Sequence, residues 1–595
     1  MCGIFGYWDR ERRAMSAEGL AGMARELVHR GPDDEGLWHQ PQRGVALGNR
    51  RLSIIDILGG HQPFVSDDGR VAVVQNGEIF NYIELAAELR GQGVPLRTAS
   101  DTEVILRLYE REGIACLSKL NGMFAIAIDD AREDPMYLAR DRIGVKPLYV
   151  ADDGRRAIFA SEMKAMLPLV PGTGSEAGID LEAVHHYLSF NYIPAPWTIW
   201  RGIRHVMPGT WMKFTRQGVQ TQRWWSLAAQ REQDFEFDDW AREFMAILDD
   251  ATRIRLRADV PFGAFLSGGV DSSSIVGLMA RHVERPVKTF CIGFADARYD
   301  ESAHAAEAAR RFGCEHTSEV AQLNMLDRWP RVLHHLDQPH GDASFMPTLR
   351  VSELAARHVK VVLTGDGGDE LFAGYDKYGE FFARADAQSM PGADFQRHYF
   401  DSISLFSAAG KQALYQPALV AQLGGIDSMH VAKPWLDEAA HFDRLNQALY
   451  LDMQLLLSGN NLVKPDRMGM AVSIEARTPF LDWRMMEFAF RSRGSTKLRS
   501  GDKKHWYKKA VTPLIGADLA YRKKQMFTVP VGEWFKSGSY GWLRQALLGS
   551  ALLGRLFRTA AMEQMLSAHR DGSANHTREL RALAALSLWA AQAGL

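Results

Sequence analysis

The chain has 595 residues, of which 46% are apolar and 24% charged, an ordinary globular composition that is rich enough to build large cores. Its 70 Lys and Arg residues nearly balance its 72 Asp and Glu residues, so the formal charge of −2 marks neither a basic nucleic-acid surface nor a polybasic membrane patch. This length suggests two large domains or several smaller ones.

The first part of the chain, to about residue 205, has the pattern of a β-rich region with interspersed helices. Helical spacing predicts helices at 83–89 and 101–110. Short apolar or alternating runs predict strands at 44–47, 71–75, 124–128, 136–139 and 157–160. A stretch rich in Trp, Gln and Arg, residues 206–235, is expected to be a linker.

From about residue 236 the pattern changes to helices interrupted by short apolar strands. The runs 262–266, 287–293 and 359–364 are typical of buried parallel strands. Helices are expected after the first two, at 272–283 and 301–312, and this alternation predicts an open α/β sheet. The last stretch of the chain, about 200 residues, is expected to be almost wholly helical.

Cys2 is a candidate nucleophile because removal of Met1 would place its thiol beside its own α-amino group. That amine has a reference pKa of about 7.7–8.0, so an appreciable fraction is neutral near pH 7 and can act as a base. The other cysteines, Cys116, Cys291 and Cys314, are widely spaced without a CxxC pair. This spacing argues against a disulfide framework or a structural zinc site and fits a reducing cytoplasm.

Short motifs after Cys2 carry the groups that hydrolysis of a glutamine side chain needs. Asn76 and the Gly77 N–H suit an oxyanion hole. Arg51 suits a carboxylate, and Glu78 and Asp101 suit an ammonium group. Each motif alone has a structural explanation too, since Asn-Gly is a common turn dipeptide and Arg51 could be a surface cation.

The segment Ser267-Gly268-Gly269-Val270-Asp271-Ser272-Ser273 follows an apolar strand and opens a predicted helix. Its glycine N–H groups, its serine hydroxyls and the helix N-terminus together form an anion cradle. It is not a GxxxxGK[ST] loop, a motif that the chain lacks. Asp271 suits Mg²⁺, and Asp369, in the glycine-rich loop after the 359–364 strand, is its expected partner. A plain turn with a helix cap is the structural alternative.

The motifs of the first 205 residues resemble the glutaminase half of the asparagine synthetase family; in chain order they are CGIFG, HRGPDD, RLSIID, NGEIFN, SDTE, NGMFA, RDRIGVKPLY and SEMKA. The SGGVDSS loop resembles the pyrophosphate-binding loop of ATP pyrophosphatases. Segments 464–468, 475–482 and 522–525 extend the resemblance to about residue 540. It implies an N-terminal-nucleophile hydrolase sandwich, two antiparallel sheets between helix layers, over 2–205. A Rossmann-like parallel-sheet domain with a helical C-terminal part is implied over 236–595.

The family's functional residues fall on matching positions of this chain. The implied catalytic residues are Cys2, Asn76, Gly77 and Lys524. The implied glutamine-binding residues are Arg51, Leu52, Ser53, Ile54, Ile55, Asn76, Gly77, Glu78 and Asp101. The implied ATP-binding residues are Leu266, Ser267, Gly268, Gly269, Asp271, Ser272, Ser273, Ile292, Thr364 and Gly365. Asp271 and Asp369 are the implied ligands of the Mg²⁺ that accompanies ATP.

The resemblance implies a cytoplasmic ligase of amino-acid biosynthesis that frees ammonia from glutamine and adds it to an acyl-adenylate, converting ATP to AMP and pyrophosphate. An internal passage for the ammonia is expected. Aspartate is the leading acceptor, giving asparagine. A uronic-acid sugar of a surface polysaccharide or a small peptide carboxylate is the alternative, because Asp366 stands where many dedicated asparagine synthetases have Glu.

A non-catalytic relative is disfavoured because Cys2, Asp271, Asp369 and Lys524 are all present. The expected partners are therefore the small molecules glutamine, ATP and aspartate, with neither nucleic acid nor membrane. The family also allows a homodimer.

Overall fold

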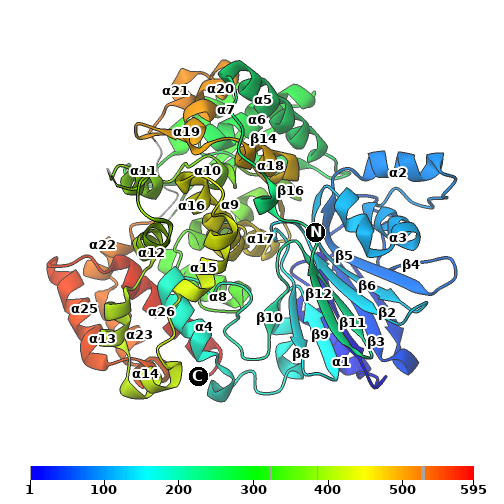
Figure 1. The fold of residues 1–595 in the computed structure, drawn as a ribbon, viewed down its shortest axis with the longest axis horizontal. Coiled ribbons are helices and arrows are strands. Elements are labelled where there is room, and N and C mark those ends of the chain that lie inside the picture. Colours follow the sequence, from blue (N-terminus) through cyan, green and yellow to red (C-terminus); the bar gives the residue numbers. More distant parts are fainter. Residues whose placement is uncertain (1, 322–324, 385, 524–528) are drawn as a thin grey trace.

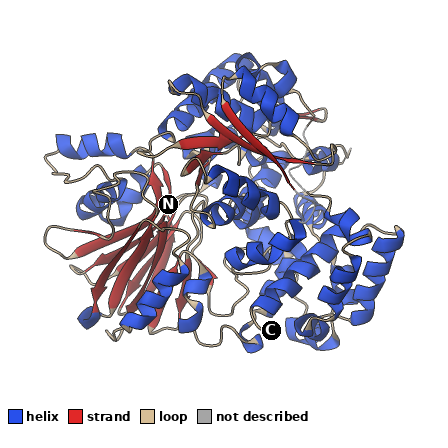
Figure 2. Ribbon diagram, turned by 180° about the vertical axis from the view of Figure 1, so that it is seen from behind, coloured by secondary structure: helices blue, strands red, loops and turns tan. Residues whose placement is uncertain are grey.

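The computed structural model describes residues 2–321, 325–384, 386–523 and 529–595. Two antiparallel sheets from the first part of the chain stand beside a parallel sheet with its helices, and the C-terminal helices lie on the far side (Figures 1 and 2). This arrangement confirms the expected fold class, a sandwich of antiparallel sheets followed by an α/β sheet with a helical C-terminal part.

The N-terminal region contains two six-stranded antiparallel sheets. The first has the spatial order β10 (Arg204–His205), β8 (Tyr149–Asp152), β9 (Arg156–Ala160), β1 (Cys2–Asp9), β3 (Val45–Arg51) and β2 (Asp34–Gln40). The second has the order β12 (Gly218–Arg223), β11 (Thr210–Thr215), β7 (Met136–Arg140), β6 (Gly122–Asp130), β5 (Val71–Ile79) and β4 (Phe64–Val65). Ile4 and Leu47 of the first sheet share a buried core with Val74 and Ala125 of the second. The sheets therefore stack face to face, as the alternation of side chains along each strand allows.

Helices cover the outer faces of this sandwich. Apolar side chains of α2 (Tyr82–Gly91) and α3 (Asp101–Glu112) share a buried core with β5 and β6. On the other side, α1 (Ala17–Glu26) packs against β1 and β3. The helices at 83–89 and 101–110 that the sequence predicted are therefore confirmed, with boundaries that differ by a few residues.

Residues 210–223, which we expected to lie in a linker, instead form β11 and β12 and extend the second sheet. Trp211 pairs with Ala139 of β7 in register. Trp211 packs on the outer face of the sheet, whereas Phe214 packs between the two sheets. Strand β11 needs apolar residues on both faces and so lacks the simple alternation that makes a half-buried strand visible in a sequence. Strand β12 is a largely exposed, polar edge strand, which has no apolar pattern either.

The second region contains a five-stranded parallel sheet. Its spatial order is β15 (Glu315–Ala321), β14 (Lys288–Phe294), β13 (Phe262–Phe265), β16 (Val361–Leu363) and β17 (Glu475–Arg477). The strands β13, β14 and β16 confirm the three predicted parallel strands, and α6 (Val270–His282) and α7 (Ser302–Arg311) confirm the two helices. The sequence missed the polar edge strand β15 and the short, charged β17.

The C-terminal region is almost wholly helical, as expected, with a short hairpin at 498–503 as an exception. Its helices that matter below are α15 (Met429–Glu438), α17 (Val463–Met470), α20 (His505–Ile515) and α26 (Thr577–Gln592), with a π-helical segment at Met453–Asn461. Within the parts of the chain that the structure describes, no helix combines the length and the apolar character that crossing a bilayer requires.

Candidate active sites

Cys2 begins β1 and is buried, with 5% of its surface exposed. Its backbone nitrogen donates a hydrogen bond to Asn76 Oδ1 at 3.1 Å. Because Met1 precedes it here, this nitrogen is an amide that stands in for the α-amine of a processed N-terminus. Burial raises the pKa of the Cys2 thiol, although hydrogen bonds with Asn49 and the Leu52 backbone oppose the rise. A protonated thiol of this kind needs a base before it can act as a nucleophile.

The proposed oxyanion hole lies where β5 passes close to β6. Gly77 has φ +149°, and a Cβ at this position would stand 1.9 Å from the Met123 carbonyl oxygen. Only glycine fits this approach. The contact fixes the backbone next to Asn76, whose side chain already touches Cys2. The sequence-predicted pair Asn76 and Gly77 is thus brought to the backbone of Cys2, and its role stays a prediction.

Three buried carboxylates gather beside this site. They belong to Glu78, Asp101 and Glu475, the last from the second region of the chain. Burial and the charges of Glu475 and Asp101 raise the pKa of Glu78 well above its usual range. Arg477 supplies a guanidinium 3.7 Å from Glu78 Oε1. Such a concentration of buried acid groups favours binding of a further cation, such as the α-ammonium of glutamine.

Arg51 lies directly opposite Cys2 in the pairing of β1 with β3. Its guanidinium donates hydrogen bonds to the carbonyls of Ile55, Asp56 and Ile57 at 3.0, 2.7 and 3.1 Å. It therefore orders the loop that follows β3, which contains the predicted glutamine-binding residues Leu52, Ser53, Ile54 and Ile55. Binding of a substrate carboxylate by Arg51 stays a prediction.

A cleft of about 1120 Å³ opens at the carboxyl ends of β13, β14 and β16. Predicted ATP-site residues line it: Leu266, Ser267, Gly269, Asp271, Ser272, Ile292, Thr364 and Gly365, together with Asp369. Gly268 instead packs against the backbone of His304, and Ser273 is fully buried in α6. The volume exceeds the range of about 300–1,000 Å³ that is usual for one small ligand, so the cleft can hold a second substrate beside ATP.

The two predicted metal ligands meet in this cleft. A Cβ on Gly365 would stand 2.7 Å from the Cβ of Asp271, so glycine is what lets the two loops touch. Lys504 Nζ lies 2.5 Å from Asp271 Oδ2 and 2.7 Å from Asp369 Oδ1. Two carboxylates converging on one cation fit the pattern of Mg²⁺ sites, in which one or two carboxylates act with phosphate oxygens.

Sequence reasoning missed Lys504. Burial alone would lower its pKa, but Asp271 and Asp369 outweigh burial and raise it, so the ammonium is charged. Lys504 has φ +53° and precedes α20. The one signal in the sequence is the turn Gly501-Asp502-Lys503-Lys504 just before a helix, which says nothing about the partners of the second lysine.

The predicted catalytic Lys524 lies outside the described residues, so its role stays a prediction. Arg522, two positions earlier, donates from Nε to the carbonyl of Gly268 at 3.2 Å. Its Nη2 donates to Glu301 at 2.7 Å. The segment that leads to Lys524 is therefore attached to the ATP loop.

A buried ion network connects Cys2 to the second region of the chain. Arg30, fully buried, donates from Nε to the Cys2 carbonyl at 3.1 Å and from Nη1 to Glu162 at 2.8 Å. It also makes a bidentate pair with Asp466, at 3.0 and 3.1 Å. Arg467 Nη1 lies 2.9 Å from the same Glu162. Motif residues to which we gave no role, from HRGPDD, SEMKA and KPDRM, thus form the contact between the two regions.

The short strand β17 reaches both sites. Its Glu475 belongs to the carboxylate group beside Cys2, and its Arg477 approaches Glu78. The carbonyl of the same Arg477 accepts a hydrogen bond from the N–H of Thr364 at 2.9 Å, next to the ATP cleft. Three residues therefore span the distance from the glutamine site to the edge of the ATP cleft.

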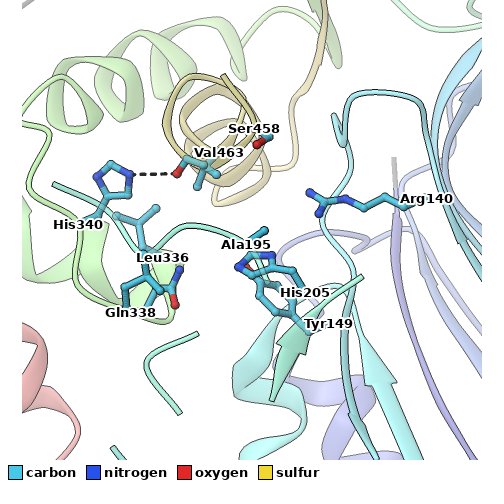
Figure 3. Close-up of a pocket in the computed structure, with 11 residues that line it drawn as sticks. Arg140, Tyr149, Ala195, His205, Leu336, Gln338, His340, Ser458 and Val463 are labelled. Atoms are coloured by element: carbon cyan, nitrogen blue, oxygen red, sulfur yellow. Dashed lines mark hydrogen bonds between the residues drawn. The ribbon is translucent and has the colours of Figure 1, made fainter. Parts of the chain in front are cut away.

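A small cavity of about 20 Å³ lies at the contact between the two regions. Arg140, Tyr149 and His205 approach it from the first region, and Leu336, Gln338, His340, Ser458 and Val463 approach it from the second (Figure 3). Burial lowers the pKa of His205 well below its usual range and that of His340 to about 4, so both rings are neutral. The cavity has room for one water-sized molecule.

Comparison with known proteins agrees with this geometry. Residues 243–591 match the model of the asparagine synthase family, and residues 1–225 match that of the glutamine amidotransferase domain. Asparagine synthetase [glutamine-hydrolyzing] 1 of Bacillus subtilis is 31% identical, over 99% of this chain and 96% of its own length. A putative asparagine synthetase [glutamine-hydrolyzing] of Mycobacterium tuberculosis is 34% identical over 99% and 97%.

More distant proteins are similar too. Amidase chry2 of Gibberella zeae is 26% identical over 90% of this chain and 90% of its own length. A solved glutamine phosphoribosylpyrophosphate amidotransferase from B. subtilis covers 53% of this chain and 65% of its own at 19% identity, with a TM-score of 0.28 that is too low to support a structural conclusion. The family models and the full-length relatives are decisive: the chain belongs to the glutamine-hydrolysing asparagine synthetase family and is a ligase of the amidotransferase kind.

Proposed function

We propose that the protein transfers the amide nitrogen of glutamine to the side-chain carboxylate of aspartate, which ATP activates as an acyl-adenylate. The observation that carries the proposal is the physical link between the two sites. Strand β17 touches the carboxylates beside Cys2 at one end and the loop after β16 at the other. Sites with unrelated reactions would not need this connection.

At the first site the Cys2 thiol attacks the glutamine side-chain amide. The α-amine freed by removal of Met1 takes the thiol proton and later gives it to the departing ammonia. The hydrogen bond from the Cys2 nitrogen to Asn76 Oδ1 fixes the position of this base. Asn76 Nδ2 and the Gly77 N–H stabilise the oxyanion. Water then hydrolyses the thioester, which gives glutamate and restores the thiol.

At the second site an oxygen of the acceptor carboxylate attacks the α-phosphorus of ATP, and pyrophosphate leaves. The Ser267–Ser272 loop and the N-terminus of α6 hold the pyrophosphate through N–H and hydroxyl groups. Asp271 and Asp369 would hold Mg²⁺, which neutralises phosphate charge when it is bound. Lys504 carries a further positive charge to the same place. Ammonia then attacks the acyl carbon, and AMP leaves as the amide forms.

Ammonia reaches the acyl-adenylate through the interior. In bulk water most ammonia is protonated and cannot act as a nucleophile at neutral pH. The cavity between the two regions is of the right size for one ammonia molecule, and the neutral rings of His205 and His340 line it. The positive charge of Arg140 on the same wall disfavours a second cation in the cavity, so the occupant is favoured in its neutral form.

Charges on the wall of the ATP cleft favour an α-amino acid as the acceptor. Asp342, Lys464 and Arg581 all line the cleft. Burial opposes ionisation of Asp342, but Lys464 and Arg581 keep its pKa below its usual range, so the carboxylate is charged. Arg581 Nε is buried and makes no hydrogen bond to any described residue. Cations and an anion side by side match the carboxylate and ammonium of an amino acid.

The size of the cleft favours a second candidate acceptor. Its volume of about 1120 Å³ exceeds the range that is usual for one small ligand, and a relative of similar length is named as an amidase. A uronic-acid sugar or a small peptide carboxylate would use this space. A uronic acid lacks the ammonium group that Asp342 would bind, whereas a peptide can offer one.

Pyrophosphate release with ATP, Mg²⁺ and glutamine tests the acceptor, with aspartate, glucuronate or a short acidic peptide added separately. We expect pyrophosphate release only when aspartate is added. Asparagine should form in an amount equal to the pyrophosphate. Release with glucuronate or peptide alone would keep the mechanism and replace the acceptor. Aspartate labelled with ¹⁸O in its side-chain carboxylate tests the acyl-adenylate, because the attacking oxygen must appear in AMP. AMP without ¹⁸O would contradict that intermediate.

A further inference from the structure

A group of metal-binding side chains lies outside both sites, where α4 (Leu181–Phe190) meets α15. In Figure 1 the two helices lie side by side, α4 in cyan and α15 in yellow. Glu182 and His186 stand one turn apart on α4, and His430 stands on the first turn of α15. One ligand atom from each, a carboxylate oxygen or an imidazole nitrogen, lies within 4.8 Å of the other two. None of the three takes part in the proposed reaction.

The distances match those between the ligands of a tetrahedral metal ion. Bonds of about 2.0–2.2 Å to zinc at tetrahedral angles place neighbouring ligand atoms about 3.3–3.6 Å apart. His186 Nε2 lies 3.4 Å from Glu182 Oε1, and His430 Nε2 lies 3.3 Å from the same oxygen. The three groups are therefore positioned before any ion is present.

A hydrogen bond of the type that metal-binding histidines make fixes the orientation of His186. His186 is fully buried, and its Nδ1 is hydrogen-bonded to Ser428 Oγ at 2.9 Å. Its Nε2 makes no hydrogen bond to the described residues and points toward Glu182. A buried polar atom without such a bond needs an explanation. A metal ion on Nε2 supplies one, with the Nδ1 proton donated to Ser428.

A simple ion pair between histidine and glutamate explains the group less well. The Nε2 atoms of His186 and His430 lie 3.4 and 3.3 Å from Glu182 Oε1, longer than the usual distance of about 2.7–2.9 Å in a tight ion pair. The Trp197 ring packs edge-on against both His186 and His430, which holds the two imidazoles together. His430 and Glu182 are partly exposed, so a water molecule can supply a fourth ligand.

We propose that Glu182, His186 and His430 bind one divalent transition-metal ion, with Zn²⁺ the best match to two imidazole nitrogens and one carboxylate oxygen. Helix α4 belongs to the part that matches the glutamine amidotransferase domain, and α15 belongs to the part that matches asparagine synthase. The ion therefore ties the two regions together at a point remote from the Arg30 network.

Metal content of the full-length protein tests the proposal. The chain is freed of metal with a chelator, dialysed against Zn²⁺ alone, and analysed for bound zinc by mass spectrometry. Zinc bound at other sites, such as Asp271 and Asp369, contributes equally to the wild type and to the variants, so the difference in zinc content between them reports the proposed site alone. His430→Gln is the main variant because His430 is exposed, so that its replacement disturbs less buried packing than replacement of the fully buried His186. His441→Gln, at another exposed histidine just after α15, is the matched control.

We expect the wild type and His441→Gln to bind one more equivalent of Zn²⁺ than His430→Gln. Glu182→Gln should lose the same equivalent, and Ser428→Ala should weaken zinc binding by about 10–100-fold. Zn²⁺ should also raise the thermal midpoint of the wild type more than that of His430→Gln. Equal zinc content in the wild type, His430→Gln and Glu182→Gln would overturn the proposal. So would equal stabilisation of all three by zinc.

Discussion

The glutamine site and the ATP cleft differ in how far their acid groups are buried and in which cations pair with them. Beside Cys2, the acid groups of Glu78, Asp101 and Glu475 are all buried, and their mutual repulsion is offset mainly by Arg477. In the ATP cleft, Asp271 and Asp369 line an open space and are both paired with the ammonium of Lys504. The acid groups of the first site are enclosed by protein, whereas those of the second face a cleft of about 1120 Å³.

The difference indicates that the two sites bind their substrates in different ways. In the proposed reaction, the buried acid groups beside Cys2 select glutamine by the position of its charges, because a buried group that is left unpaired costs free energy. In the same proposal, the open cleft gathers ATP, Mg²⁺ and the acceptor, so its charges stay accessible to substrate. The Arg30 network and β17 join the two. Variants on either side of this contact should therefore separate the two half-reactions.

Cys2→Ala should have the largest effect and affect one site alone. Glutamine-dependent turnover should fall by at least about 10³-fold, because the nucleophile is lost. Turnover with added ammonia should persist, since the ATP cleft is untouched. Product formation with each nitrogen source measures the two arms, and Cys314→Ala, at a half-buried cysteine far from both sites, is the control. Loss of both activities would show that the two sites are not separable in this way.

Lys504→Gln should affect the other site. The substitution removes the cation between Asp271 and Asp369. Loss of a group that contacts metal ligands typically lowers metal affinity or activity by about 10–100-fold. Pyrophosphate release should fall with either nitrogen source, while glutamine hydrolysis alone continues. Lys509→Gln, at an exposed lysine on the helix α20 that follows Lys504, should leave both unchanged. A selective loss of glutamine hydrolysis would contradict our assignment of Lys504.

Asp466→Asn should weaken the connection while sparing both sites. It breaks the bidentate pair with Arg30, which itself donates to the Cys2 carbonyl. We expect glutamate to form in excess of the amide product, because ammonia is lost at the loosened contact. The ratio of glutamate to amide product measures this. Asp518→Asn, which removes an exposed pair with Arg311, should keep the ratio at one. A ratio of glutamate to amide product of one in Asp466→Asn would show that the Arg30 network is not needed to couple glutamine hydrolysis to amide formation.

Lys497→Met should have the smallest effect, on stability alone, because this lysine serves neither site. Burial lowers the pKa of Lys497 to about 7 from 10.5. The unfolded chain then binds more protons between these values, so this group makes stability rise with pH above about 7, by at most about 1.4 kcal/mol per pH unit. The thermal midpoint of the wild type, measured relative to that of Lys497→Met, should rise between pH 7 and 9. Lys433→Met, at an exposed lysine, should follow the wild type.

Local patterns predicted much of the fold. The glycine-rich loops after β13 and β16 could be placed because a buried strand precedes each one and a helix follows it. Cys2 and Asn76 were found because both lie in short motifs with an obvious chemistry. In the hairpin, β11 was missed because it has apolar residues on both faces, and β12 because it is polar and largely exposed. Strand β17 was missed because a charged three-residue strand has no apolar pattern.

What the sequence could not show are the contacts between distant residues. Arg30 meets Asp466, Lys504 meets Asp271, and Glu182 meets His430 only after folding. Each of these residues in isolation is an ordinary charged or polar residue, with a solvated surface as its commonest place. The partner that gives it a role lies more than 200 positions away in each case, 436 for Arg30 and Asp466. No periodicity or short motif reports such a distance.

The most direct test of the account follows the nitrogen itself. The protein is given ATP, Mg²⁺, aspartate and glutamine labelled with ¹⁵N in its amide, in the presence of excess unlabelled ammonium. If the two sites act together through the interior, the asparagine formed should carry ¹⁵N nearly in proportion to the glutamine consumed. Asparagine whose label matches that of the bulk ammonium would contradict the account, because it would mean that nitrogen leaves the first site before it reaches the second.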